Sequence, residues 1–215
     1  PLLVAQTAPA IRATREIRPV AVKSFGDTVY VFDFGENMAG VCRLSVQGEK
    51  GTKITMQHGE LQKANGRVEM GNIDIYYKPL PGLAFQTDTY TLKGEGVETF
   101  TPDFTYHGFQ YVEVKSDRPV KLNEESLTAL FVHTAVEPVG TFSCSNELMN
   151  KIWKATNQSY LSNLHSIPTD CPHREKNGWM ADGYMVQEAG MINFDSRNIY
   201  AKWVNDMIDA QEADG

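Results

Sequence analysis

The spacing of apolar residues changes near Pro138, and this change limits the folds that the chain can adopt. From about residue 17 to residue 134, apolar and polar side chains alternate with a period of two, as they do in half-buried strands. After Pro138, apolar residues recur every three to four positions, as on one face of a helix. The sequence therefore predicts a β-rich part followed by an all-α part.

The β-rich part is predicted to consist of short strands joined by turns. Val29–Phe34 is β-branched and aromatic, and the glycine-bounded segment Gly35–Gly40 is predicted to be a turn, as is Gly48–Gly51. Further strands are predicted at Thr52–His58, Asp88–Leu92, Phe104–Tyr106, Phe109–Val114 and Leu127–His133. Residues 62–86, with two prolines, are predicted to form a long excursion loop. Such strands and turns favour an antiparallel, jelly-roll-like β-sandwich.

Three helices are predicted after Pro138. Ser145 is expected to cap the first, Asp182 to cap the second, and the third begins near Arg197 with no stop signal before Asp214–Gly215. The predicted apolar faces are Leu148, Ile152, Ala155, Tyr160 and Leu164; then Met185, Val186 and Ala189; then Ile199, Trp203, Val204, Met207 and Ile208. Three helices form a small layer that must bury these faces against something else. We therefore expect the chain to be an excerpt of a longer protein, with self-association through an exposed stripe of Ile199, Trp203 and Met207.

Composition and charge exclude several classes of partner. The chain has 215 residues, with 20 Lys and Arg against 27 Asp and Glu, a formal charge of −7. An acidic chain without basic clusters is not expected to bind nucleic acid. The apolar runs, such as Ala129–Val132, are far shorter than the roughly 20 residues of a membrane span, so no membrane partner is expected. No signal peptide is visible, and the cellular compartment stays undetermined.

The cysteines and histidines do not match a metal-binding or disulfide pattern. Cys42, Cys144 and Cys171 are widely spaced and odd in number, without a C-x-x-C pair. We interpret Cys171 as a buried thiol beside the loop histidine His173. The remaining strand histidines, which are predicted to pack or hydrogen-bond rather than bind metal, are His58, His107 and His133. No metal site and no cofactor are therefore assigned.

An acidic loop between the first two predicted helices carries the groups most suited to chemistry. Residues 168–182 contain three carboxylates, a guanidinium and an indole, which are Asp170, Glu175, Asp182, Arg174 and Trp179. Carboxylates accept hydrogen bonds from vicinal hydroxyls, and an indole stacks on the apolar face of a sugar. Each group also has a purely structural interpretation: a helix cap for Asp182, a solvated ion pair for Arg174 and Glu175, and a core anchor for Trp179. Both interpretations stay open on spacing alone.

Four segments of the sequence resemble one enzyme family. Asp170–Asp182 is similar to the signature of bacterial α-L-rhamnosidases of glycoside hydrolase family 78. Phe32–Gly40 and Phe104–Val114 resemble that family's β-sandwich domain, and Gly140–Asn146 resembles the entry into its (α/α)6-barrel catalytic domain. The resemblance implies a tail of a preceding β domain or linker at residues 1–18, a sandwich at 19–137, and the first part of the (α/α)6 barrel at 138–215.

The resemblance also implies a reaction and roles for residues. Family members remove terminal α-L-rhamnose from glycosides or polysaccharides with inversion, using one carboxylic acid and one carboxylate across the sugar. It makes Glu175 the general acid, and has Asp170 and Asp182 bind rhamnose hydroxyls while Arg174 and Trp179 line the pocket. His173 stands where the family more often has Gln and is left unassigned.

The general base is not identified in this chain. In the family it is a Glu far downstream, so neither Glu188 nor Glu212 is assigned, and the chain alone is expected to be inactive. The alternative to an enzyme is a non-catalytic module, either carbohydrate-binding or structural.

Overall fold

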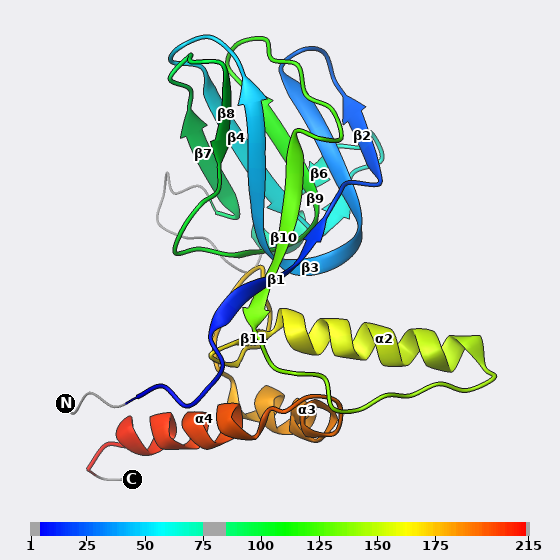
Figure 1. Cartoon of the computed structure of the whole chain (residues 1–215), viewed down its shortest axis with the longest axis vertical. Coiled ribbons are helices and arrows are strands. Elements are labelled where there is room, and N and C mark those ends of the chain that lie inside the picture. The colour runs from blue at the N-terminus through cyan, green and yellow to red at the C-terminus, as the bar shows by residue number, and fades with distance from the viewer. Residues whose placement is uncertain (1–4, 75–84, 214–215) are drawn as a thin grey trace. The chain divides into compact units, whose positions relative to one another are not determined.

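The computed structural model describes residues 5–74 and 85–213, and these divide into two compact units. The β-sandwich unit contains residues 13–132 together with the short segment 172–175. The helical unit contains residues 5–12, 133–171 and 176–213. The predicted order of an antiparallel β-sandwich followed by helices is confirmed (Figure 1).

Eight strands form the main antiparallel sheet of the sandwich. Its path runs β1-β10-β3-β9-β4-β7, and β2 and β8 also pair with β3. The strands are β1 Ile11–Ile17, β2 Ala21–Ser24, β3 Val29–Gln47, β4 Lys53–Gly59, β7 Thr87–Thr91, β8 Val97–Phe100, β9 His107–Ser116 and β10 Leu127–Thr134. The segment that we assigned to a preceding domain thus contributes β1, whose mostly exposed side chains give no alternating pattern to detect.

Strand β3 is a single strand of 19 residues, so the prediction of a turn at Gly35–Gly40 is wrong. The glycine-rich stretch is instead an irregularity within the strand, where the register with β9 shifts between Asp33 and Met38. Gly35 has a φ of +74°, and its N–H donates to Asp33 Oδ1 at 2.8 Å. A positive φ at glycine is how a bulge bends a strand without ending it.

Two further predictions change in detail. The strand predicted at Phe104–Tyr106 is wrong, because Phe104 has a φ of +58° and a fully exposed side chain. The predicted excursion loop contains a small hairpin and one helical turn, namely β5 Leu61–Gln62, β6 Val68–Glu69 and α1 Gly71–Asp74. Residues 75–84 of that loop, with Pro79 and Pro81, lie outside the described residues.

Alternating apolar side chains of the strands supply the core of the sandwich. Phe34 and Phe109 meet edge to face at 5.9 Å between ring centroids. The fully buried side chains in this unit include Phe32, Met38, Leu44, Ile54, Met56, Ile73, Leu127 and Phe131. Each such side chain contributes roughly 1.5–3 kcal/mol by leaving water, so burial is what fixes the register of these strands.

The helical unit contains three helices and one tight hairpin. They are α2 Glu147–Ser162, β11 Leu164–His165, β12 Ile167–Pro168, α3 Met180–Asn193 and α4 Arg197–Asp209. Asn146, not Ser145, caps α2, because its side chain accepts from the N–H groups of Leu148 and Met149. The sequence showed no stop signal for the last helix before Asp214–Gly215, but α4 ends at Asp209, with Ala210 as its C-cap. Residues 211–213, the last that the structure describes, are not helical.

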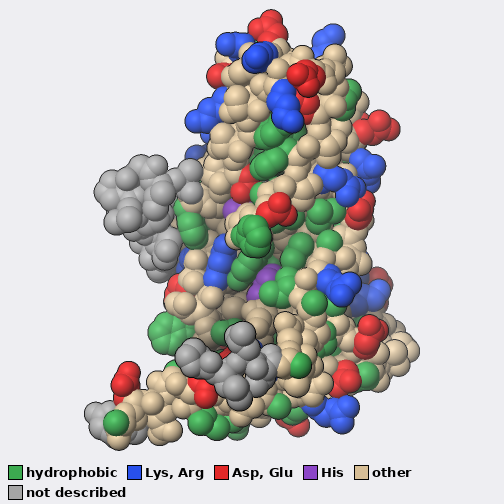
Figure 2. Space-filling model, turned by 60° about the vertical axis from the view of Figure 1, so that its left-hand side comes forward, with side chains coloured by type: hydrophobic (Ala, Val, Ile, Leu, Met, Phe, Trp, Pro, Cys, Tyr) green, Lys and Arg blue, Asp and Glu red, His purple; other side chains and the backbone are tan. Residues whose placement is uncertain are grey.

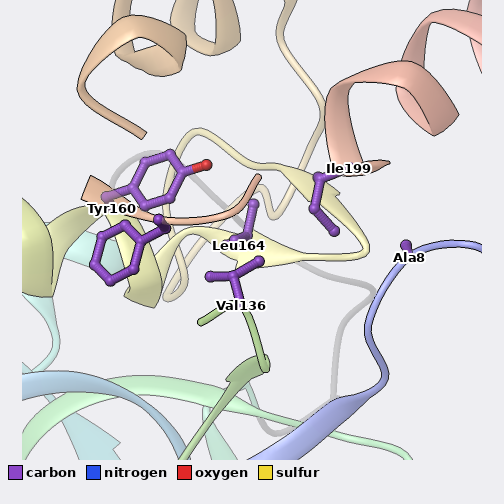
Figure 3. Close-up of a cluster of buried hydrophobic side chains, with 6 residues drawn as sticks. Ala8, Val136, Tyr160, Leu164 and Ile199 are labelled. Carbon is purple, nitrogen blue, oxygen red and sulfur yellow. The ribbon is translucent and has the colours of Figure 1, made fainter. Parts of the chain in front are cut away.

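A separate cluster of buried side chains forms the core of the helical unit. Tyr160, Leu164, Val136, Ile199 and Ala8 converge there from segments far apart in the sequence (Figure 3). Tyr160 also stacks on Phe194, with ring centroids 5.5 Å apart. Ala8, from the segment before β1, is therefore buried in the core of the helical unit.

Two residues of the stripe predicted to be exposed on α4 are buried instead, and Met207 is half-buried. Ile199 is 0% exposed and Trp203 is 7% exposed, because Trp203 packs on a glycine of α3. Exposed apolar side chains of this unit include Leu148, Ile152, Tyr184, Met185, Ile192 and Ile208.

Charged side chains of both signs are interspersed over the face of the molecule shown in Figure 2. None of the helices in the described part of the chain has the length and apolar character that crossing a bilayer requires.

Candidate active site

The acidic loop connects β12 to α3, and its residues are divided between the two units. Asp170, Trp179 and Asp182 belong to the helical unit. Arg174 and Glu175 belong to the sandwich unit, within the segment 172–175. Sequence reasoning predicted one site from consecutive residues and did not foresee this division.

Asp170 is held in place by the loop that it opens. Its N–H donates to Asn177 O, and Asn177 N donates back to Asp170 Oδ1, both at 3.0 Å. The Cys171 thiol donates to Asp170 Oδ2 at 2.8 Å. These hydrogen bonds fix the carboxylate of Asp170. The prediction that Cys171 is a buried thiol is confirmed.

A cavity of about 780 Å³ lies between α2 and α3, with Asp170 and Asp182 both in its wall. This volume is within the range of small-molecule sites. The remaining wall is mostly apolar or hydroxylated and consists of Ala155, Thr156, Ser159, Tyr160, Asn163, Pro168, Thr169, Ala181, Met185, Val186 and Ala189. Two carboxylates on a largely apolar wall can accept hydrogen bonds from hydroxyls while the wall covers C–H surface.

The start of α3 corrects two structural interpretations. Trp179 is the residue before the helix and makes no side-chain cap, and Asp182 lies inside the first turn, so Asp182 is not the N-cap. Its carboxylate in the first turn interacts favourably with the positive end of the helix dipole. Trp179 is 52% exposed and is therefore not a core anchor.

The segment 172–175 rests on the sandwich. His173 Nδ1 lies 3.4 Å from Glu60 Oε1, and the side chain of Asn37 donates to the same oxygen at 2.9 Å. A Cβ on Gly108 would come within 2.9 Å of Pro172 and His173 atoms, so only glycine lets β9 approach this closely. Sequence reasoning missed Glu60 and Gly108, and nothing in their local patterns could have indicated the contact.

Glu175, at the end of this segment, is exposed, and Arg174 is half-buried.

Comparison with known proteins places both units in one family. Residues 23–133 match the bacterial alpha-L-rhamnosidase concanavalin-like domain, and residues 137–215 match the bacterial alpha-L-rhamnosidase 6 hairpin glycosidase domain. A curated α-L-rhamnosidase of Formosa agariphila is 34% identical over 94% of this chain, which covers 21% of that relative. One of Streptomyces avermitilis is 35% identical over 99% of this chain, which covers 20% of that relative. The chain thus spans about a fifth of the length of these curated relatives.

Solved structures agree with the sequence matches. The structure of α-L-rhamnosidase from Dictyoglumus thermophilum superimposes with a TM-score of 0.88 at 41% identity, covering 97% of this chain and 23% of that one. The structure of the Streptomyces avermitilis α-L-rhamnosidase complexed with L-rhamnose superimposes with a TM-score of 0.86 at 34% identity, covering 99% of this chain and 20% of that one.

Proposed function

Because this chain belongs to the bacterial α-L-rhamnosidases of glycoside hydrolase family 78, we propose that it supplies the acid side of an inverting α-L-rhamnosidase site. The observation that carries the proposal is the position of the acidic loop. The loop lies inside the segment that matches the family's 6 hairpin glycosidase domain, and it carries Asp170 and Asp182 in the wall of a cavity large enough for a sugar. The Streptomyces avermitilis relative was solved with L-rhamnose, which supports terminal rhamnose as the substrate group.

In this proposal Glu175 protonates the leaving oxygen as the general acid. Asp170 and Asp182 accept hydrogen bonds from rhamnose hydroxyls, Arg174 holds a hydroxyl in fixed geometry, and Trp179 stacks on the sugar face. Inversion requires a second carboxylate across the sugar, roughly 6.5–9.5 Å from the acid, to activate water. We assign no residue of this chain to that role.

The test uses a polypeptide of the relatives' length that contains this chain. Glu175→Gln should lower kcat about 10²- to 10⁴-fold on a rhamnoside with a poor leaving group, and less on a nitrophenyl rhamnoside, which needs little protonation. Substrate binding should be unchanged. Equal losses on the two substrates would remove Glu175 from the role.

Glu147→Gln is the matched control, because Glu147 is an exposed carboxylate of the helical unit paired only with Lys151 across one helical turn among its described contacts. This variant should retain full turnover on both substrates.

We further propose that the 215-residue chain self-associates through exposed apolar side chains of the helical unit rather than through the α4 stripe. Met185 is 79% exposed and Ile192 is 62% exposed, and both lie on α3. Light scattering should show oligomers that Met185→Lys with Ile192→Lys converts to monomer. A monomer in the unaltered chain would contradict the proposal.

A further inference from the structure

We propose that His58, Asp88 and His107 form a binding site for one divalent transition-metal ion in the sandwich, with Zn²⁺ as the fitting ion. The three residues come from the neighbouring strands β4, β7 and β9. The described residues place one ligand atom from each within 4.8 Å of the other two. Their side chains are 0%, 10% and 6% exposed, respectively, so this is a buried cluster and not a chance meeting of surface groups.

The distances between ligand atoms suit a tetrahedral ion. Asp88 Oδ2 lies 3.0 Å from His107 Nε2 and 3.9 Å from His58 Nε2. Zinc bonds of about 2.0–2.1 Å in tetrahedral geometry separate neighbouring ligand atoms by roughly 3.3 Å, which lies between the two observed distances. The two imidazole rings are stacked, with centroids 4.2 Å apart and planes 23° apart. Binding a common ion requires a modest opening of that interplanar angle.

The hydrogen bonds behind the histidines determine which ring nitrogens face the carboxylate. His58 Nδ1 lies 3.2 Å from the backbone oxygen of Gln86, which can only accept, so this nitrogen carries the proton. Gln86 Nε2 donates to Gly108 O at 2.7 Å, and Gln86 Oε1 therefore faces His107 Nδ1 at 3.3 Å and accepts from it. In both rings Nε2 is the nitrogen directed at Asp88. Nε2 of His107 donates to Asp88 Oδ2 at 3.0 Å, and a bound ion would take the place of that hydrogen.

This arrangement is the one that metal sites use. A metal-bound histidine almost always donates its other N–H to a carbonyl or carboxylate, which fixes the tautomer and the ring orientation. One residue, Gln86, does this for both rings. Gln86 is itself buried and has a φ of +53°, a backbone conformation that non-glycine residues rarely adopt and that is concentrated at functional sites.

The donor set selects the class of ion. Two imidazoles and one carboxylate suit Zn²⁺ and its neighbours, whereas Ca²⁺ and Mg²⁺ prefer oxygen ligands alone. Three protein ligands leave a fourth position for water. The sequence pattern indicated no metal site, because the three residues are far apart in the chain and each lies in an ordinary strand pattern.

The position of the cluster indicates a structural role. His107 is followed by Gly108, which contacts Pro172 and His173 of the acid-bearing segment. An ion joining β4, β7 and β9 would stiffen the part of the sandwich on which that segment rests.

The test is metal binding by the whole 215-residue chain after chelation and dialysis. Isothermal titration with Zn²⁺ should show one tight site per chain, and Co²⁺ should give the visible absorption of a tetrahedral site. His107→Ala and Asp88→Asn should each weaken binding at least 100-fold. Gln86→Met, which removes only the side-chain acceptor behind His107, should weaken it about 10- to 100-fold.

His133→Ala is the control, because His133 is also a buried strand histidine, on β10, with Nδ1 bonded to Thr134 O at 2.8 Å. The His133→Ala variant should bind Zn²⁺ as tightly as the unaltered chain, even if its free energy of unfolding is lower. Circular dichroism identifies any variant that fails to fold. If the variants do not fold, the Co²⁺ spectrum of the unaltered chain decides whether a tetrahedral site is present. Absence of a site in the folded chain, or binding unchanged in both His107→Ala and Asp88→Asn, would overturn the proposal.

Discussion

Gly183 of α3 lies directly against the indole of Trp203 of α4, so that a Cβ at position 183 would be 2.2 Å from Trp203 Cη2. Real Cβ atoms do not approach so closely, and the two helices can pack as they do only because position 183 has no side chain. A second glycine of α3, seven residues later, makes the same kind of close contact: a Cβ on Gly190 would lie 2.4 Å from Tyr160 Cζ. Helix α3 therefore meets its neighbours through two glycines on one face.

We expect Gly183→Ala to destabilise the helical unit by about 1–3 kcal/mol, because overpacking moves the indole or the helix. All three tryptophans, Trp153, Trp179 and Trp203, are in this unit, so urea unfolding followed by Trp fluorescence reports on it. Trp203→Leu is also destabilising, but adding Gly183→Ala to it should cost much less than in the unaltered chain. Additive effects would show that the contact is not the cause.

Glu113 should make the sandwich unit sensitive to acid. Burial by itself raises the pKa of Glu113, but hydrogen bonds from Arg67 and Lys115 and from Val68 N outweigh it and hold the pKa at about 2. Arg67 binds both carboxylate oxygens, at 2.6 and 2.7 Å. Because the folded pKa lies below the ordinary value of 4.5, the stabilisation is present above pH 4.5 and is lost as pH falls towards 2. The loss is roughly 3 kcal/mol.

Glu113→Gln should therefore be less stable than the unaltered chain at pH 7, with a difference that shrinks between pH 4.5 and 2. Far-UV circular dichroism during denaturant unfolding measures this. Glu124→Gln, at an exposed carboxylate of the same unit, should follow the unaltered chain throughout. A constant difference for Glu113→Gln across the whole pH range would contradict the linkage.

Tyr160→Phe should destabilise the helical unit by about 1–2 kcal/mol. The hydroxyl of Tyr160 donates to Ser196 Oγ at 2.9 Å, and Ser196 is fully buried, so removing the donor leaves a hydroxyl unsatisfied inside the core. Tyr184→Phe is the control, because Tyr184 lies on α3 and is 71% exposed. Trp fluorescence in urea should separate the two variants, and equal midpoints would show that the buried bond contributes nothing.

Two of the three cysteines, Cys42 and Cys144, should differ sharply in reactivity. Burial raises the pKa of the Cys42 thiol well above its usual range, and the nearby Asp88 carboxylate raises it further, so little thiolate forms. Cys144 is exposed and free. A thiol reagent at pH 8 should label Cys144 rapidly and Cys42 only after unfolding, which mass spectrometry of peptides can follow. Rapid labelling of Cys42 in the native chain would show that this part of the sandwich opens.

The sequence predicted elements with a clear local pattern. Strands β9 and β10 are buried over much of both faces, and they were found because they are rich in β-branched and aromatic residues. Strand β4 was found because Ile54 and Met56 face the core at every second position. Helix α4 was found at its correct start for the same kind of reason. The irregularity at Gly35 was read as a turn, since glycine has the same local signal whether a strand bends or ends.

The candidate site was predictable only as a set of residue types. The acidic loop has an unusual composition, and Asp170 and Asp182 do line one cavity. Which unit holds each half of the loop depends on contacts between distant segments, such as His173 with Glu60, and these have no local signature. The exposure of Trp179 and the burial of Trp203 were likewise decided by packing and not by helical spacing.

The chain passes between the two units four times, at residues 12–13, 132–133, 171–172 and 175–176. No single cut in the chain separates the sandwich from the helices, because the four residues 172–175, which include Glu175, belong to the sandwich unit although helical-unit segments flank them in the sequence. Exchanging the helical part of this protein for that of a relative would therefore also exchange the residues that rest on Glu60 and Gly108. A chimaera should therefore take the sandwich and residues 172–175 from the same parent protein.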